Sequence, residues 1–171
     1  NIDVNMEAFQ YPNLVVNAPS FVCANDTLKM RLEATGEGPW QVIYYENGVK
    51  HFLDFDEAIY TLKTIPTEEN TVYLFESISS GNTCSTILQK QVTVSVGFPP
   101  SDATQITGFS DVCRNTSERY VVPVIPRATS YVWTFPQGYT IISGHGSNIV
   151  TVDIGADAVE GTATVYGMSE C

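Results

Sequence analysis

Four cysteines are the side chains of this chain whose spacing points most clearly to chemistry. Cys23 and Cys113 each lie in a copy of the tetrapeptide Val-Cys-x-Asn, and each is followed some sixty residues later by one further cysteine, Cys84 or Cys171. Four cysteines allow three pairings, and only Cys23 with Cys84 plus Cys113 with Cys171 keeps each bridge inside one copy of the repeat. We therefore expect these two disulfides, which would form in an oxidising compartment.

A zinc site is the alternative use of the same thiols. Structural zinc sites are built from closely spaced Cys and His ligands, commonly beginning with a Cys-x-x-Cys pair. The four cysteines never occur in such a pair, and the two histidines, His51 and His145, are isolated. Disulfides are the interpretation that the spacing favours.

A short acidic cluster is a weak candidate for a calcium site. Asp54, Asp56 and Glu57 supply several carboxylate oxygens within four residues, and oxygen is the ligand that Ca²⁺ prefers. The spacing does not match an EF-hand loop, and a solvated hairpin tip is the interpretation that we favour. No metal and no cofactor is therefore predicted, with these three residues kept as weak calcium candidates.

Three aromatic residues of the first repeat are candidates for stacking on a sugar ring, namely Trp40, Tyr44 and Tyr45. Trp40 follows the segment Gly36-Glu37-Gly38-Pro39, which could lie at an exposed rim. The alternative is a core tryptophan, because Trp40 and Trp133 both fall on the third predicted strand of their repeats. The core interpretation is the one that we favour for both tryptophans.

Catalytic motifs are not found in this sequence. A nucleophile elbow, a P-loop, a dinucleotide fingerprint and a zinc-protease helix all require helices that the sequence does not predict. Neither histidine has an Asp or Glu at a spacing that would indicate a catalytic pair. Paired carboxylates of the glycosidase type lie far apart along a chain and would escape such a search. The sequence nevertheless predicts a protein that is not an enzyme.

The elements that must position these residues are β-strands. Helical periodicity is nearly absent, and short alternating or β-branched runs are bounded by Gly, Pro, Asn and Asp. The first repeat has the seven strands of an Ig-like sandwich, and its Asn47-Gly48 dipeptide predicts a type I′ hairpin. The expected strands of the first repeat are 14–17, 27–35, 40–45, 51–55, 60–65, 71–77 and 88–96. Those of the second are 104–107, 119–124, 130–135, 139–143, 149–154 and 162–166.

The domain organisation follows from the ninety-residue offset between the two tetrapeptides. We expect a linker or the end of a preceding segment over 1–18, an Ig-like β-sandwich over 19–97, a Pro-rich hinge over 98–103 and a truncated sandwich over 104–171. The second sandwich lacks a counterpart of the last strand of the first. Its open sheet edge could accept a strand from another protein.

The charge of the chain restricts its partners. It carries 19 acidic and 8 basic side chains, a net charge of −11, with 12 acidic and 5 basic before Gly97 and 7 and 3 after it. Nucleic acid is a poor partner, because a phosphate backbone demands basic patches. No apolar run reaches the length needed to span a bilayer, and the first residues do not resemble a signal peptide, so no membrane insertion is expected.

The second repeat resembles the PKD-like Ig-fold modules of Bacteroidetes surface proteins, including gliding-motility adhesins and other cargo of type IX secretion. The first repeat is similar to a sister type through 22–28 and 36–40, although its middle section is longer. The residues that carry the resemblance of the second repeat are Ile106-Thr107-Gly108, Val112-Cys113, Tyr120 to Pro123, Ala128 to Pro136, Gly138 to Ile141, Gly144 to Val152 and Gly161 to Tyr166.

This resemblance implies extracellular display in arrays of modules, without a shared catalytic site. Asp26-Thr27-Leu28 also resembles the motif at which such organisms attach O-glycans, and this implies Thr27 as an acceptor; the alternative is the start of a strand. We expect a non-catalytic structural or adhesive module of a secreted or surface-anchored protein, with neighbouring modules, surface glycans or another protein as partners. The alternative is a carbohydrate-binding module attached to a secreted hydrolase.

Overall fold

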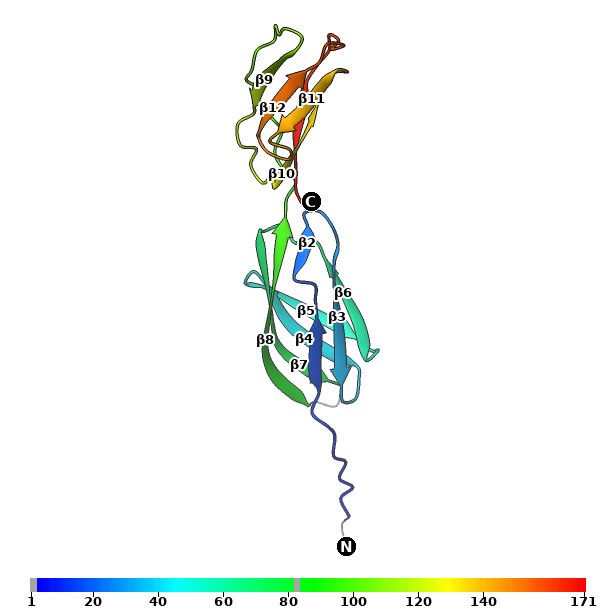
Figure 1. Ribbon diagram of the computed structural model, residues 1–171. Helices are drawn as coiled ribbons and strands as arrows, with labels where there is room; N and C mark the ends of the chain where they lie inside the picture. The colour runs from blue at the N-terminus through cyan, green and yellow to red at the C-terminus, as the bar shows by residue number, and fades with distance from the viewer. Residues whose placement is uncertain (1–2, 82–83) are drawn as a thin grey trace. The chain divides into compact units, whose positions relative to one another are not determined.

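The chain consists of β-strands that are joined by turns and irregular segments. The computed structural model describes residues 3–81 and 84–171 and contains no helix within them (Figure 1). The chain divides into two units, Asn1–Gly97 and Phe98–Cys171. Among the described residues, no helix is long and apolar enough to cross a membrane.

The first unit is a sandwich of two sheets. The larger sheet has the strand order β2-β8-β7-β4-β5, and the smaller has the order β1-β3-β6. All neighbouring strands are antiparallel except β2 and β8, which are parallel. The strands are β1 (Asn13–Asn17), β2 (Phe21–Cys23), β3 (Leu28–Thr35), β4 (Trp40–Glu46), β5 (Val49–Phe55), β6 (Ile59–Thr64), β7 (Asn70–Ser80) and β8 (Ser85–Gly97).

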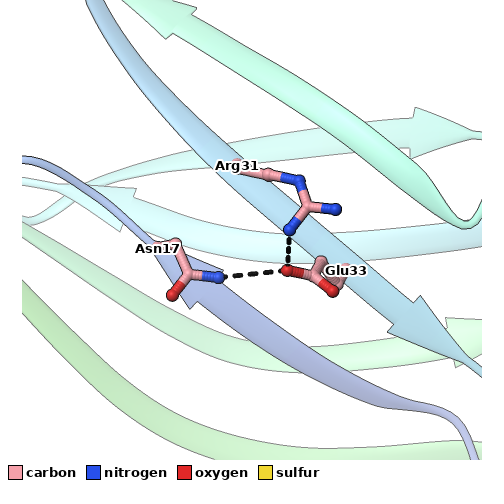
Figure 2. A network of polar contacts seen from close by, with 3 residues as sticks. All are labelled: Asn17, Arg31 and Glu33. Atoms are coloured by element: carbon pink, nitrogen blue, oxygen red, sulfur yellow. Dashed lines mark hydrogen bonds and ion pairs between the residues drawn. The ribbon is translucent and has the colours of Figure 1, made fainter.

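Alternation of apolar and polar residues forms the core between these sheets. On β3, Leu28, Met30 and Leu32 are buried, and the charged residues between them face outward, as the period of two of a strand requires. On that outward face Arg31 and Asn17 both donate to the Glu33 carboxylate, with Asn17 Nδ2 at 3.2 Å (Figure 2). The other fully buried side chains of this core include Leu14, Val42, Tyr73, Phe75, Ile78 and Val94.

The hairpin between β4 and β5 is the one that the sequence predicts. Asn47 and Gly48 have φ values of +47° and +84°, as a type I′ turn requires. The register runs without a shift from the pair Glu46 and Val49 to the pair Trp40 and Phe55. This prediction is confirmed.

The second unit also has two sheets, with the orders β11-β12-β9 and β10-β13. The indole of Trp133 donates to the Ser147 carbonyl at 2.9 Å and lies in a small core with Tyr120, Val122 and Val150. The strands are β9 (Thr116–Val121), β10 (Ser130–Thr134), β11 (Tyr139–Ser143), β12 (Ile149–Ile154) and β13 (Thr164–Met168).

The structure differs from the expected strands in an additional strand, in one strand that is reduced to a bridge, and in several strand ends, including those of β7, β8 and β9. β2 was not expected, because three residues are too few for a readable alternation. The strand expected over 104–107 is reduced to a bridge between Thr107 and Val121. β13 extends to Met168, beyond the expected limit at residue 166.

Candidate functional site

Two of the three predicted sugar-stacking residues are part of the core. Trp40 is only 6% exposed, its indole donates to the Thr35 carbonyl at 3.2 Å, and its ring packs on Phe55. Tyr44 is 7% exposed and stacks against His51 and Phe75, with ring centroids 4.9 Å and 5.6 Å away. Both point inward because they occupy alternate positions of one strand. The stacking prediction is wrong for these two residues, and the core interpretation of Trp40 is confirmed.

Tyr45 points to the opposite, outward face of the same strand. The Lys50 ammonium lies 5.7 Å from the centroid of the Tyr45 ring and 5.4 Å from that of Phe52, which is 63% exposed. The Tyr45 hydroxyl donates to Glu76 at 3.4 Å, and Lys50 lies 3.9 Å from the same carboxylate. We call Tyr45, Lys50, Phe52 and Glu76 the outer aromatic patch.

Lys50 and Phe52 were not among the predicted site residues, although the sequence contains a signal that places them in this patch. The hairpin at Asn47-Gly48 fixes Lys50 as the partner of Tyr45 and Phe52 as the partner of Ile43. Residues opposite or diagonal to one another on one face of a sheet are neighbours. Glu76 could not be placed in this way, because it lies on a distant strand beside a register shift between Phe75 and Ser77.

The predicted calcium candidates do not form a metal site. Within residues 3–81 and 84–171, no group of three or more His, Cys, Asp or Glu side chains is arranged to hold a metal ion. Asp54 lies on β5 and accepts a hydrogen bond from Gln41 Nε2 at 2.9 Å. Asp56 and Glu57 are exposed in the bend after that strand. The three carboxylates do not form a calcium site because side chains along a strand end and the following bend point in different directions and do not converge on one ion.

A polar clasp connects the two sheets of the first unit. The hydroxyl of the fully buried Tyr73 on β7 donates to the Glu46 carboxylate on β4 at 3.0 Å, and Thr64 on β6 donates to the same carboxylate at 3.2 Å. Burial raises the pKa of the Tyr73 hydroxyl far above its usual value, so the hydroxyl stays protonated and remains a donor. Glu46 also lines an open polar pocket of about 570 Å³ that includes His51 and Glu68.

The second unit has an aromatic pocket at one end of its sandwich. The pocket has a volume of about 320 Å³ and is lined in part by Phe109, Tyr120, Phe135 and Tyr139. The Tyr120 hydroxyl donates to the Phe109 carbonyl at 3.1 Å, which holds the loop over the ring. Gly108 is required in that loop, because a Cβ there would lie 2.3 Å from the Tyr120 ring.

The cysteines of the first unit lie too far apart for the expected bridge. Cys23 pairs with Gly97 at the last residue of β8, whereas Cys84 directly precedes the first residue of that strand. A strand of this length separates its ends by about 40 Å, and a disulfide needs Cα atoms within about 7 Å. The predicted bridge between Cys23 and Cys84 is therefore wrong.

The expected bridge of the second unit fails for the same kind of reason. Cys113 lies beside Tyr139, at the first residue of β11. Cys171 follows β13, which runs from Thr164 to Met168 and ends beside Ser130, at the opposite end of the sandwich. Cys113 has an exposed thiol, whereas Cys23 and Cys171 are in the disulfide form. The predicted pairing of Cys113 with Cys171 is wrong, and the presence of disulfide chemistry in the chain is supported.

Two further predicted residues lie on the surface. Thr27 is exposed immediately before β3, where a modifying enzyme could reach it, and its role as an O-glycan acceptor stays a prediction. His145 lies in the turn between β11 and β12, as the Gly144-His145-Gly146 sequence indicates.

Comparison with known proteins finds a sequence similarity for the second unit. Residues 99–171 match the sequence model of the PKD-like domain family. No curated protein matches the sequence.

Solved structures of titin share the fold. The I-band fragment I67-I69 from titin has a TM-score of 0.57 and 11% identity, over 96% of this chain and 62% of that fragment. A three-Ig structure of the E-to-A mutated variant of I67-I69 has a TM-score of 0.52 and 10% identity, over 95% of this chain and 62% of that one. The chain thus spans less than two thirds of either titin fragment. The second unit resembles a PKD-like domain, and the chain as a whole has the predicted all-β fold of tandem Ig-like sandwiches.

Proposed function

We propose that this chain is a structural and adhesive segment of a larger secreted or surface-anchored protein. The observation that carries the proposal is the match of residues 99–171 to the PKD-like family, directly after a second sandwich of Ig-like fold. Domains of these types are generally non-catalytic modules of larger proteins. In this role the chain displays binding surfaces and connects neighbouring modules.

Cysteine chemistry and charge support an extracellular location. Cys23 and Cys171 are in the disulfide form, which persists in oxidising compartments and is rare in the reducing cytosol. The net charge of −11 keeps an exposed protein soluble by repulsion between copies.

Labelling of intact cells tests this location. Cells that produce the full-length protein are treated with a biotin reagent that cannot cross membranes, and the culture medium is collected separately. We expect the chain to be labelled on intact cells or recovered from the medium, while a cytoplasmic control protein stays unlabelled. Labelling of the chain only after lysis would refute the proposal.

The outer aromatic patch favours a second function, the binding of a glycan. Phe52 and Tyr45 present ring surface beside Gln41 and Asp54, and sugars are held by stacking on rings together with hydrogen bonds to amide and carboxylate groups.

Polysaccharide retention tests this second function. We expect Phe52→Ala to abolish retention on the polysaccharide that the wild-type chain binds, and Trp40→Phe, which changes a buried ring, to leave retention unchanged. Absence of retention on every polysaccharide tested, or equal retention by Phe52→Ala, would exclude glycan binding at this patch.

A further inference from the structure

The strand β5 (Val49–Phe55) is an open edge of the larger sheet in the first unit. It is the last strand in the order β2-β8-β7-β4-β5, so within residues 3–81 and 84–171 no strand pairs with the other side of its backbone. Proteins protect such edges with proline, bulges, very short strands or charged side chains; of these devices β5 has only the charges of Lys50 and Asp54. β5 has seven residues, no proline and an unbroken register with β4, whereas the opposite edge, β2, has only three residues.

The hairpin determines which backbone groups face outward from this edge. In a hairpin with a two-residue turn, the pair that flanks the turn exchanges both of its hydrogen bonds, and the bonded pairs then alternate. That pair is Glu46 and Val49, so every second residue from Val49 bonds to β4. The N–H and C=O groups of Lys50, Phe52 and Asp54 therefore point toward the open side.

The charges on this edge are arranged symmetrically about its central residue. Lys50 lies two residues before Phe52, and Asp54 lies two residues after it. All three side chains lie on the outward face of the sheet, because they alternate with the half-buried His51 and Leu53. A strand with this pattern is complementary to an antiparallel copy of itself.

We propose that two copies of this chain associate through β5, in antiparallel register centred on Phe52. Phe52 then lies opposite Phe52 of the second copy, and each Lys50 lies opposite an Asp54. In this register the free N–H and C=O groups of Lys50, Phe52 and Asp54 in one copy face the same groups in the other copy. About six hydrogen bonds therefore form between the copies. The two five-stranded sheets become one continuous sheet.

Two observations favour a second copy over an unrelated strand. The two ion pairs require a positive charge and a negative charge at mirrored positions, which a two-fold axis supplies automatically. Phe52, 63% exposed in the single chain, loses exposed surface against its counterpart, and the neighbouring Ile43 extends the apolar strip on each side. The net charge of −11 on each copy opposes this association, and the two Lys50–Asp54 pairs offset part of that repulsion at the edge. This inference does not depend on the proposed surface location.

Charge reversal tests the proposed register. Sedimentation of the intact chain is followed over a series of concentrations for the wild type, Lys50→Asp and Asp54→Lys. Each single variant places like charges opposite one another and should weaken self-association about tenfold or more. An equimolar mixture of the two variants should associate again, because every acidic position of one chain then faces a basic position of the other.

A matched control separates the edge from the overall charge. Lys29→Asp makes the same change in net charge as Lys50→Asp. It lies on the outward face of β3, the central strand of the smaller sheet, and should leave the association unchanged. Circular dichroism spectra of all the variants are compared with that of the wild type, to check that each variant is folded. A wild-type chain that stays monomeric over the whole series, single variants that associate normally, or a mixture that stays monomeric would each overturn the proposal.

Cross-linking checks the central residue independently. In a background that carries both Cys84→Ser and Cys113→Ser, Phe52→Cys should form a covalent dimer under mild oxidation, since directly opposed bonded residues have Cα atoms about 5.5 Å apart. Lys50→Cys should not, because the two copies of that residue lie about 14 Å apart in this register. A Lys50→Cys dimer without a Phe52→Cys dimer would refute the register.

Discussion

Removal of the Tyr73 hydroxyl should destabilise the first unit by a predictable amount. The ring of Tyr73 is fully buried, and its hydroxyl donates to the Glu46 carboxylate at 3.0 Å. A hydrogen bond to a charged group contributes about 1.5 to 3 kcal/mol. Glu46 keeps its bond from Thr64 and its access to water through the pocket, so the cost lies at the low end. We expect Tyr73→Phe to lose about 1.5 to 2 kcal/mol, or roughly 6 to 15 °C in Tm.

Trp40 provides a probe that reports on this unit alone. In a Trp133→Phe background, Trp40 is the only tryptophan, and it lies in the core of the first unit. Urea unfolding followed by Trp40 fluorescence then gives the stability of that unit, even if the second unit unfolds at another concentration.

Tyr45→Phe is the matched control for this measurement. It deletes the same atom from the outward face of β4, where the hydroxyl makes a long contact of 3.4 Å to Glu76. Exposed polar contacts of this kind contribute about 0.5 kcal/mol or less. Equal losses for Tyr73→Phe and Tyr45→Phe would refute the stabilising role of the clasp.

Three further outcomes are expected. Because burial raises the pKa of Tyr73 above its unfolded value near 10, the stability that this hydroxyl contributes should be fully present below about pH 10 and should fall by about 1.4 kcal/mol per pH unit above it. Urea unfolding at alkaline pH should therefore show a shallower loss of stability for Tyr73→Phe. Gly144→Ala should unfold the second unit, because its Cβ would lie 2.0 Å from a backbone oxygen, whereas Gly146→Ala, with a similar positive φ and open space, should cost only about 1 kcal/mol by thermal melting. In the native chain iodoacetamide should modify Cys113, and mass spectrometry should find Cys171 modified only after reduction; the reverse pattern would contradict the assignment.

Local sequence patterns predict the strands of this chain because strand formation depends on near neighbours. The alternation of β3 and the Asn47-Gly48 turn each need only a few consecutive residues to be read. β4 is harder, because Ile43 and Tyr45 on one face are as apolar as Val42 and Tyr44 on the other. The alternation therefore could not say which tyrosine points into the core, and the stacking prediction included both.

Contacts between distant strands could not be predicted from the sequence. Cys23 lies beside Gly97 because β2 pairs in parallel with β8, and no local pattern reports a parallel pairing across seventy residues. A ninety-residue repeat indicates which cysteines belong to one unit but not which end of the sandwich each occupies. The contact of Glu46 with Tyr73 likewise needs the fold, since 27 residues separate them.

The parallel pairing of β2 with β8 has a consequence for how the first unit bears tension. β2 is held by bonds from Ala24 N–H to the Gly97 carbonyl at 2.7 Å and from Ser95 N–H to the Ser20 carbonyl at 2.9 Å. A pull on the chain before β2, opposed by a pull beyond Gly97, slides two parallel strands past each other. The bonds are then sheared together instead of opening one after another. Under a pull from the N-terminal side, β1 and its pairing with β3 bear the load first, and this short parallel pair of strands resists next.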